Sequence, residues 1–112
     1  MALHTERCVA CRRDSPRITA DEIADLHPQI PEWLVSEDEG TKPLKKGFKF
    51  RDFAGALEFA RSVGELAERE GHHPRIVLEW GNVTIQWWTH AIKGLHRNDF
   101  IMAAKTDGLY EG

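Results

Sequence analysis

The sequence has few cysteines, no excess of positive charge and no long apolar run. Two cysteines in 112 residues, Cys8 and Cys11, are too few for a disulfide framework, so we expect a cytoplasmic protein with reduced thiols. A net charge of -3 argues against a nucleic-acid partner, because binding to a phosphate backbone needs a basic surface. No segment approaches the roughly 20 apolar residues that cross a bilayer, and the first residues lack the apolar stretch of a signal peptide. We therefore expect neither a membrane partner nor secretion.

The remaining composition is that of one ordinary globular domain. Hydrophobic residues make up 41% of the chain and charged residues 29%. A chain of this length can bury one modest core without disulfides or metals. Residues 1–18 are polar and predict a mobile or loosely docked arm, followed by a domain over residues 19–112.

The first part of this domain predicts a short helix and two strands. Thr19 and Glu22 have the spacing of a capping box, which favours a helix that runs through Leu26. Residues 33–36 are typical of a short strand. Apolar and lysine residues alternate over 44–50, which predicts a half-buried strand.

The strongest helical pattern covers residues 53–70. Apolar residues recur there at spacings of three and four, Asp52 can cap the first turn, and Gly71 and Pro74 mark the end. Two further strands, 76–80 and 83–88, alternate on either side of the turn pair Gly81-Asn82.

A last short helix is expected to begin at Asn98 or Asp99 and to end near Gly108. The order is therefore α-β-β-α-β-β-α. It predicts an α+β fold with a four-stranded antiparallel sheet and helices packed on one face. The uncovered face and edges of such a sheet favour self-association.

Three of the six histidines stand out. His72 and His73 follow the long helix, whose negative dipole end favours an imidazolium. Pairing of the last two strands brings His90 back toward this pair. Imidazole has an ordinary pKa of about 6.5 and therefore suits proton transfer at neutral pH. The alternative interpretation is a polar helix cap beside a strand-end surface residue, and we interpret His4, His27 and His96 as surface residues.

The residues around these histidines resemble a known family. The pattern is Glu68-x-x-x-His72-His73-Pro74, with Trp80 six residues after Pro74, then Thr89-His90 and Asp99. The steps of 17 residues from His73 to His90 and of 9 residues to Asp99 are similar to those of the pterin-4a-carbinolamine dehydratase family. That family is also known as the dimerisation cofactor of a homeodomain transcription factor. The resemblance covers roughly residues 31–109.

This resemblance implies a lyase that converts a 4a-hydroxytetrahydropterin into quinonoid dihydropterin and water, with no cofactor and no metal. The pterin is the cofactor of aromatic amino acid hydroxylases, which suggests a functional link to such an enzyme. His72 and His90 are expected to exchange protons with the substrate, and His73 to hold it. Of the other residues, Glu68 would orient a histidine or bind the ring, and Asp99 would support His90.

Three more residues complete the expected site. Backbone groups near Trp88 and Thr89 could bind the pyrimidine edge of the pterin. Trp33 is either a wall of the pocket or a core aromatic. The resemblance further implies a homodimer or homotetramer.

Three other functions stay open at this point. The chain could be a protein-binding dimerisation cofactor, or a pterin-binding protein without turnover. It could also be a metal-binding regulator, since Cys8 and Cys11, with His4 as a third ligand, would supply part of a zinc site.

Overall fold

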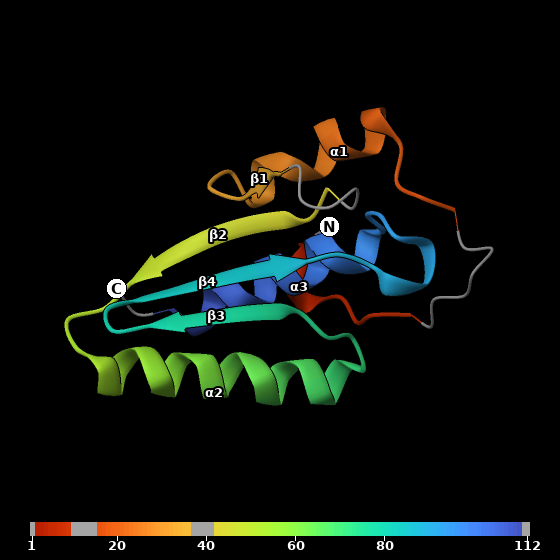
Figure 1. The fold of residues 1–112 in the computed structure, drawn as a ribbon. Helices are drawn as coiled ribbons and strands as arrows, with labels where there is room; N and C mark the ends of the chain where they lie inside the picture. The colour runs from red at the N-terminus through yellow and green to blue at the C-terminus, as the bar shows by residue number, and fades with distance from the viewer. Residues whose placement is uncertain (1, 10–15, 37–41, 111–112) are drawn as a thin grey trace.

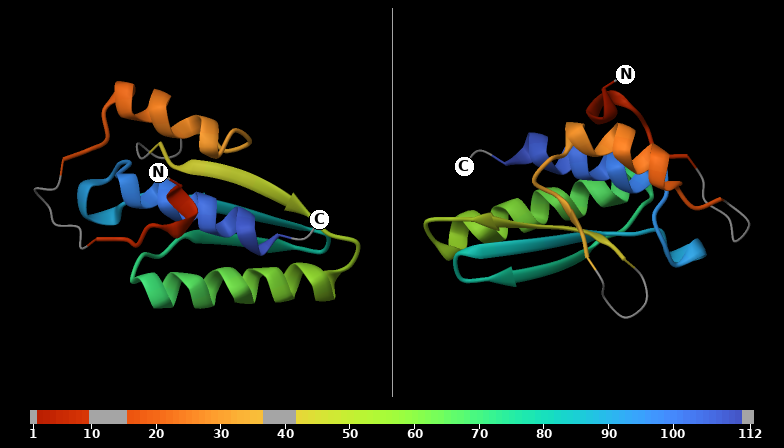
Figure 2. Two further views of the ribbon diagram at one scale, coloured as in Figure 1. Left: turned by 180° about the vertical axis from the view of Figure 1, so that it is seen from behind. Right: turned by 90° about the horizontal axis from the view of Figure 1, so that it is seen from above.

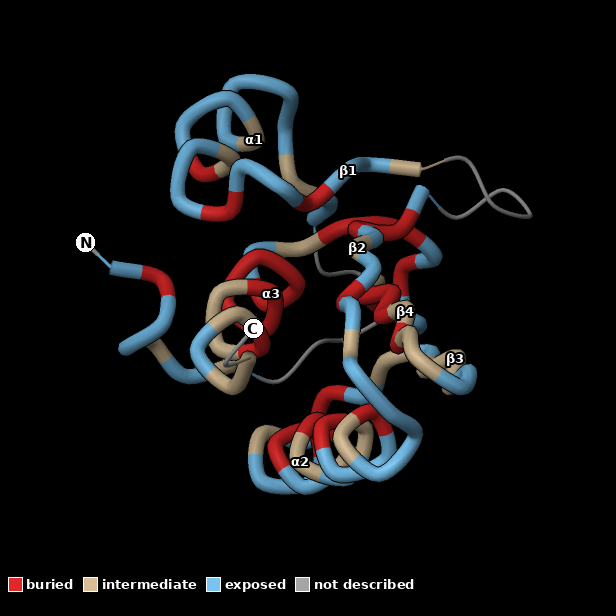
Figure 3. Tube along the Cα trace, turned by 90° about the vertical axis from the view of Figure 1, so that its left-hand side faces the viewer, coloured by how far each residue is buried: buried red, intermediate tan, exposed pale blue. Residues whose placement is uncertain are grey.

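The computed structural model describes residues 2–9, 16–36 and 42–110. Four strands form one antiparallel sheet in the order β1-β2-β4-β3, where β1 is Leu34–Val35, β2 is Leu44–Lys49, β3 is Arg75–Glu79 and β4 is Asn82–Trp87. Helices α2, Phe53–Glu70, and α3, Arg97–Leu109, cover the same face of this sheet, and α1, Ala20–Leu26, lies above its β1 edge (Figures 1 and 3). The predicted α+β class, element order and one-sided helix layer are confirmed.

The core lies between the sheet and these helices. Alternate residues of β4, Val83, Ile85 and Trp87, are fully buried, as the period-two pattern predicted. In β2, Leu44 and Phe48 point to the same side. Figure 3 shows this buried layer between the strands and α2 and α3.

Local sequence signals set the helix ends. The Asp52 side chain accepts a hydrogen bond from Gly55 N and begins α2, and Gly71, in the left-handed region at φ 66°, ends it. Thr19 and Glu22 form the predicted capping box of α1. These three predictions of the sequence are confirmed.

Two boundaries differ from the sequence prediction. The β3–β4 turn is Trp80-Gly81, with Glu79 paired to Asn82, whereas Gly81-Asn82 was predicted. The shift keeps every side chain on its predicted face, because it moves the pairing by two residues. Helix α3 is capped by His96, whose Nδ1 accepts from Asn98 N, in place of Asn98 or Asp99. The interpretation of His96 as a mere surface residue was therefore wrong.

The described part of the N-terminal arm is packed against the domain, where the composition predicted a mobile or loosely docked segment. Leu3 is 0% exposed and belongs to the core. Glu6 accepts two hydrogen bonds from Arg97, at 2.9 and 2.7 Å, and the arginine lowers the pKa of this carboxyl below its usual value. Seen from behind, the red N-terminal segment lies alongside α3 (Figure 2). The segment 2–9 is therefore an integral part of the packed structure.

In the described part of the chain, the helices are too short or too polar to cross a bilayer.

Candidate functional site

The three singled-out histidines line one cleft of about 610 Å³. It lies where α2 ends, β3 begins and the chain leaves β4 (Figure 1). Its lining comes from three separate segments: Cys8, Val9, Glu70, Gly71, His72, His73, Thr89, His90 and Ala91. A cleft of this size can enclose a small bicyclic ligand.

His72 is the buried histidine of the cleft, at 8% exposure. Its Nε2 lies 2.6 Å from Asp99 Oδ1, and its ring stacks on Trp87 at a centroid distance of 5.9 Å. A carboxylate oxygen accepts, so Nε2 carries the proton in this bond and Nδ1 is left as the nitrogen that can exchange protons with a ligand.

Asp99 organises this part of the site. Besides the bond from His72, its Oδ2 accepts from the Thr89 hydroxyl at 2.8 Å and from His96 N at 2.9 Å. The carboxylate is fully buried and bonds groups from three different segments. The family resemblance implied that Asp99 supports His90; the structure corrects this, because the histidine bonded to Asp99 is His72.

His73 is paired with the last turn of α2. Its Nε2 lies 2.7 Å from Glu68 Oε1, on the exposed side of the cleft. The left-handed Gly71 reverses the chain after the helix, which allows His73 to return to a residue of the preceding turn. A carboxylate therefore orients this second imidazole as well.

His90 completes the group from the opposite side. It opens the short 3-10 helix His90–Ile92 after β4, and its Nε2 lies 3.3 Å from the carbonyl oxygen of His73. A carbonyl only accepts, so this bond places the proton on Nε2 and leaves Nδ1 as an acceptor. The ring lies 4.6 Å from that of Trp88. The structure thus brings the three histidines together, as the sequence predicted.

The remaining candidates divide between the cleft and the core. Thr89 lines the cleft, but its backbone N and O both bond Gly94, so they are already engaged within the protein. Trp88 flanks His90 without lining the cleft itself. Trp33 is fully buried in the core and donates to Asp107, so of its two interpretations the structure supports the core aromatic.

Sequence reasoning missed five residues that line the cleft beside the histidines. Glu70, Gly71 and Ala91 adjoin them in sequence and could have been found by proximity. Cys8 and Val9 had no local signal, because more than 60 residues separate them from His72 in the chain.

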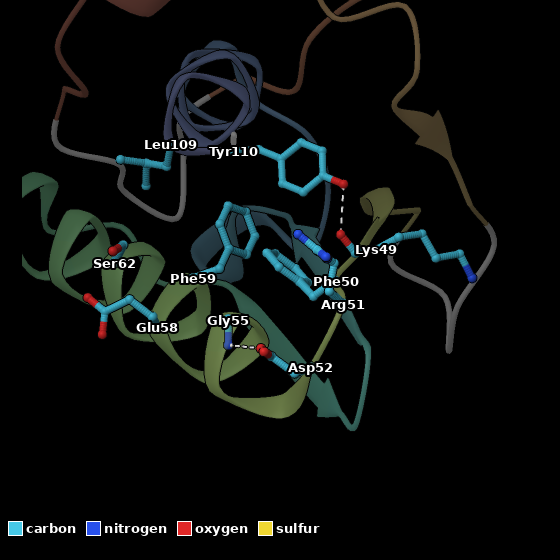
Figure 4. A pocket seen from close by; sticks show the side chains of 10 residues that line it. All are labelled: Lys49, Phe50, Arg51, Asp52, Gly55, Glu58, Phe59, Ser62, Leu109 and Tyr110. Carbon is cyan, nitrogen blue, oxygen red and sulfur yellow. Dashed lines mark hydrogen bonds between the residues drawn. The ribbon is translucent and has the colours of Figure 1, made fainter. Parts of the chain in front are cut away.

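A second cavity, of about 520 Å³, lies at the other end of α2 (Figure 4). Aromatic rings of Phe50, Phe59 and Tyr110 line it. Two of its polar side chains already make hydrogen bonds within the protein: Asp52 caps α2, and the Tyr110 hydroxyl donates to Lys49 O. Its lining contains no histidine, so it is a poor candidate for proton transfer at neutral pH.

Within the described ranges, no group of three or more histidine, cysteine, aspartate or glutamate side chains is arranged so that it could hold a metal ion. The zinc hypothesis involved Cys11, which lies outside the described residues.

The comparisons with known proteins agree on one family. The family model for pterin 4 alpha carbinolamine dehydratase matches residues 16–109. A relative from Gloeobacter violaceus, named "Putative pterin-4-alpha-carbinolamine dehydratase 1", is 60% identical over 97% of this chain and 94% of its own. One from Saccharophagus degradans with the corresponding name is 54% identical over 98% and 97%. A crystal structure of a transcriptional coactivator/pterin dehydratase from Brucella melitensis superposes with a TM-score of 0.74 at 26% identity, covering 84% of this chain and 98% of that one.

Proposed function

Because this chain belongs to the pterin 4 alpha carbinolamine dehydratase family, we propose that it removes water from a 4a-hydroxytetrahydropterin by histidine acid–base catalysis. It is an enzyme of the hydro-lyase class. A proton reaches the 4a-hydroxyl, the C4a–O bond breaks, and water leaves. The N5 proton is removed, and its bonding electrons form the C4a=N5 double bond of the quinonoid dihydropterin.

One observation carries this proposal: three imidazoles line a single cleft, and carboxylates orient two of them. The reaction needs one group that donates a proton and one that accepts it, and both can be imidazole. His72 and His90 each have Nε2 engaged within the protein, so their Nδ1 atoms are assigned to the proton exchange. His73, fixed by Glu68 at the open side, is assigned to holding the ring.

The chemistry of the substrate suggests where the reaction belongs. A pterin hydroxylated at C4a is the by-product of a hydroxylase that spends a tetrahydropterin, so this step would return the pterin toward its reducible form. We assign the chain to the recycling of the pterin cofactor of aromatic amino acid hydroxylases.

Self-association is part of the proposal, as a homodimer or homotetramer. Phe53 and Leu57 on α2, and Leu34 and Val35 on the β1 edge, are large apolar side chains exposed on the single chain. Edge strands and apolar helix faces of this kind favour contact with another copy.

The test is a stopped-flow dehydration assay with 4a-hydroxytetrahydropterin. His72→Ala and His90→Ala should each lower kcat by about 10²–10⁴-fold, the usual contribution of a positioned acid or base. His4→Ala, which removes an exposed histidine outside the cleft, should retain wild-type turnover. If both cleft variants turn over as fast as wild type, histidine catalysis is contradicted. A wild type that binds pterin without turnover would contradict the dehydratase assignment.

A further inference from the structure

The N-terminal arm contributes two residues to the histidine cleft. Cys8 and Val9 belong to its lining, together with the ends of α2 and β4. Both lie ahead of residues 16–109, the part of the chain that the family model matches. Val9 is 63% exposed, so a ligand in the cleft can still cover much of its surface.

The backbone of Cys8 and Val9 is hydrogen-bonded to two helices. Val9 N donates to Asn98 Oδ1 at 3.0 Å, and Asn98 Nδ2 donates to Val9 O at 2.7 Å, so the amide pairs with Val9 as a neighbouring strand would. Cys8 N donates to Glu70 Oε1 at 3.1 Å. The arm is therefore bonded to the end of α2 and to the start of α3.

Asn98 connects the arm to the histidines through the chain itself. It is buried, and the next residue is Asp99, which holds His72. One turn of α3 thus positions both the apolar side chain of Val9 and the imidazole of His72. Arg97, in the same turn of α3, forms an ion pair with Glu6, which fixes the arm at a point outside the cleft.

The chemistry of the lining indicates what Val9 does. Imidazoles, Glu70 and Thr89 make much of the cleft polar, and Val9 is the largest aliphatic side chain in its lining. A reduced pterin presents apolar ring faces as well as polar edges, and an aliphatic wall gains free energy when such a face covers it.

We infer that Val9 is a substrate-positioning residue, which packs against the bound pterin, and that the anchors of the arm set its place. This inference rests on the proposed function, since it takes the histidine cleft as the pterin site. Val9 touches no proton in the reaction, so its contribution is to binding and not to the chemical step.

The experiment compares Val9→Ala with Val77→Ala, a matched valine on the outer face of β3, away from the cleft. Val9→Ala should raise KM about three- to tenfold, with kcat within twofold of wild type and an unchanged Tm. Val77→Ala should leave KM unchanged. Equal KM values for the two variants, or a fall in kcat without a rise in KM, would overturn the inference.

A second variant tests the role of the anchor. Glu6→Ala removes the ion pair at a distance from the cleft, and it should raise KM in the same direction as Val9→Ala. If Glu6 acts through the position of Val9, the fold-increase in KM of the double variant should be well below the product of the fold-increases of the two single variants. Strictly multiplicative effects would show that the arm does not act as one unit.

Fluorescence titration with a non-reacting pterin separates this inference from the proposed function. The Kd for this pterin should be higher in Val9→Ala and in Glu6→Ala than in wild type, even if the wild type fails to dehydrate the carbinolamine. If the wild type shows no turnover but the two variants show these increases in Kd, only the dehydratase assignment is contradicted. If the wild type turns over normally and the Kd values do not rise in the variants, only the role of the arm is contradicted.

Discussion

Asp99 accepts three hydrogen bonds, and its replacement by asparagine tests what they do. An amide has one acceptor oxygen and one donor nitrogen, so in Asp99→Asn either His72, bonded to Oδ1, or Thr89 and His96 N, both bonded to Oδ2, lose their acceptor. If the amide nitrogen faces His72, the imidazole must move its proton to Nδ1, the wrong tautomer for the proposed exchange. We expect kcat to fall about 10²-fold, and the unfolding free energy to fall by about 1–3 kcal/mol.

The matched control is Asp52→Asn. Asp52 caps α2 at the end remote from the cleft, and asparagine caps a helix about as well as aspartate. Its kcat and thermal unfolding should match those of wild type. Wild-type kcat in Asp99→Asn would refute the orienting role of Asp99.

Single residues of the site were predictable only where the signal was local. The pair His72-His73 and the returning His90 could be placed in one cleft, because a helix end and a hairpin decide their positions. The partner of Asp99 could not, since a carboxylate one turn into α3 can reach either His72 or His90 until the packing of α3 is known.

At the scale of elements, Gly64 inside α2 and Gly71 directly after its end should respond in opposite ways to alanine. Gly71 has φ 66°, and a Cβ there would meet no atom within 4 Å, so the cost of Gly71→Ala is conformational, about 1 kcal/mol. Gly64 lies inside the helix with the same open space, so Gly64→Ala should stabilise by about 0.5–1 kcal/mol.

Thermal unfolding at fixed protein concentration measures both. We expect Tm to fall by a few degrees in Gly71→Ala and to rise in Gly64→Ala. Equal shifts of the same sign would contradict the left-handed cap.

The elements whose ends carry ordinary caps were predictable from sequence. The bounds 53–70 of α2 agree with the structure, because Asp52 and Gly71 are strong signals at its two ends. The start of α3 was missed, since a histidine seldom caps a helix and Asn98 and Asp99 are the more usual choices. The β3–β4 turn was misplaced because Trp80 extends the apolar alternation beyond the strand.

At the scale of the whole molecule, the arm should respond to acid. The hydrogen bonds from Arg97 lower the pKa of Glu6 from its ordinary value of 4.5. Their contribution to docking is therefore complete above that value and is lost as the pH falls through the lowered pKa. NMR shifts of the amides of residues 2–9 should change below pH 4.5 in wild type, and Glu6→Gln should lack this transition. A transition that persists in Glu6→Gln would assign it to another group.

The docking of the arm was beyond sequence reasoning. Its bonds to Asn98 and Arg97 join residues about 90 positions apart, and neither periodicity nor capping chemistry reports on such pairs. Polar composition suggested a mobile or loosely docked segment, yet the polar groups of the arm serve as its anchors, and Leu3 is buried in the core.

The long separation of these partners has a consequence during synthesis. Asn98, which fixes the arm, leaves the ribosome 89 residues after Val9, and Asp99, which holds His72, leaves it 27 residues after that histidine. A nascent chain therefore carries His72 and His73 without a formed cleft, and the site comes into being only as α3 folds.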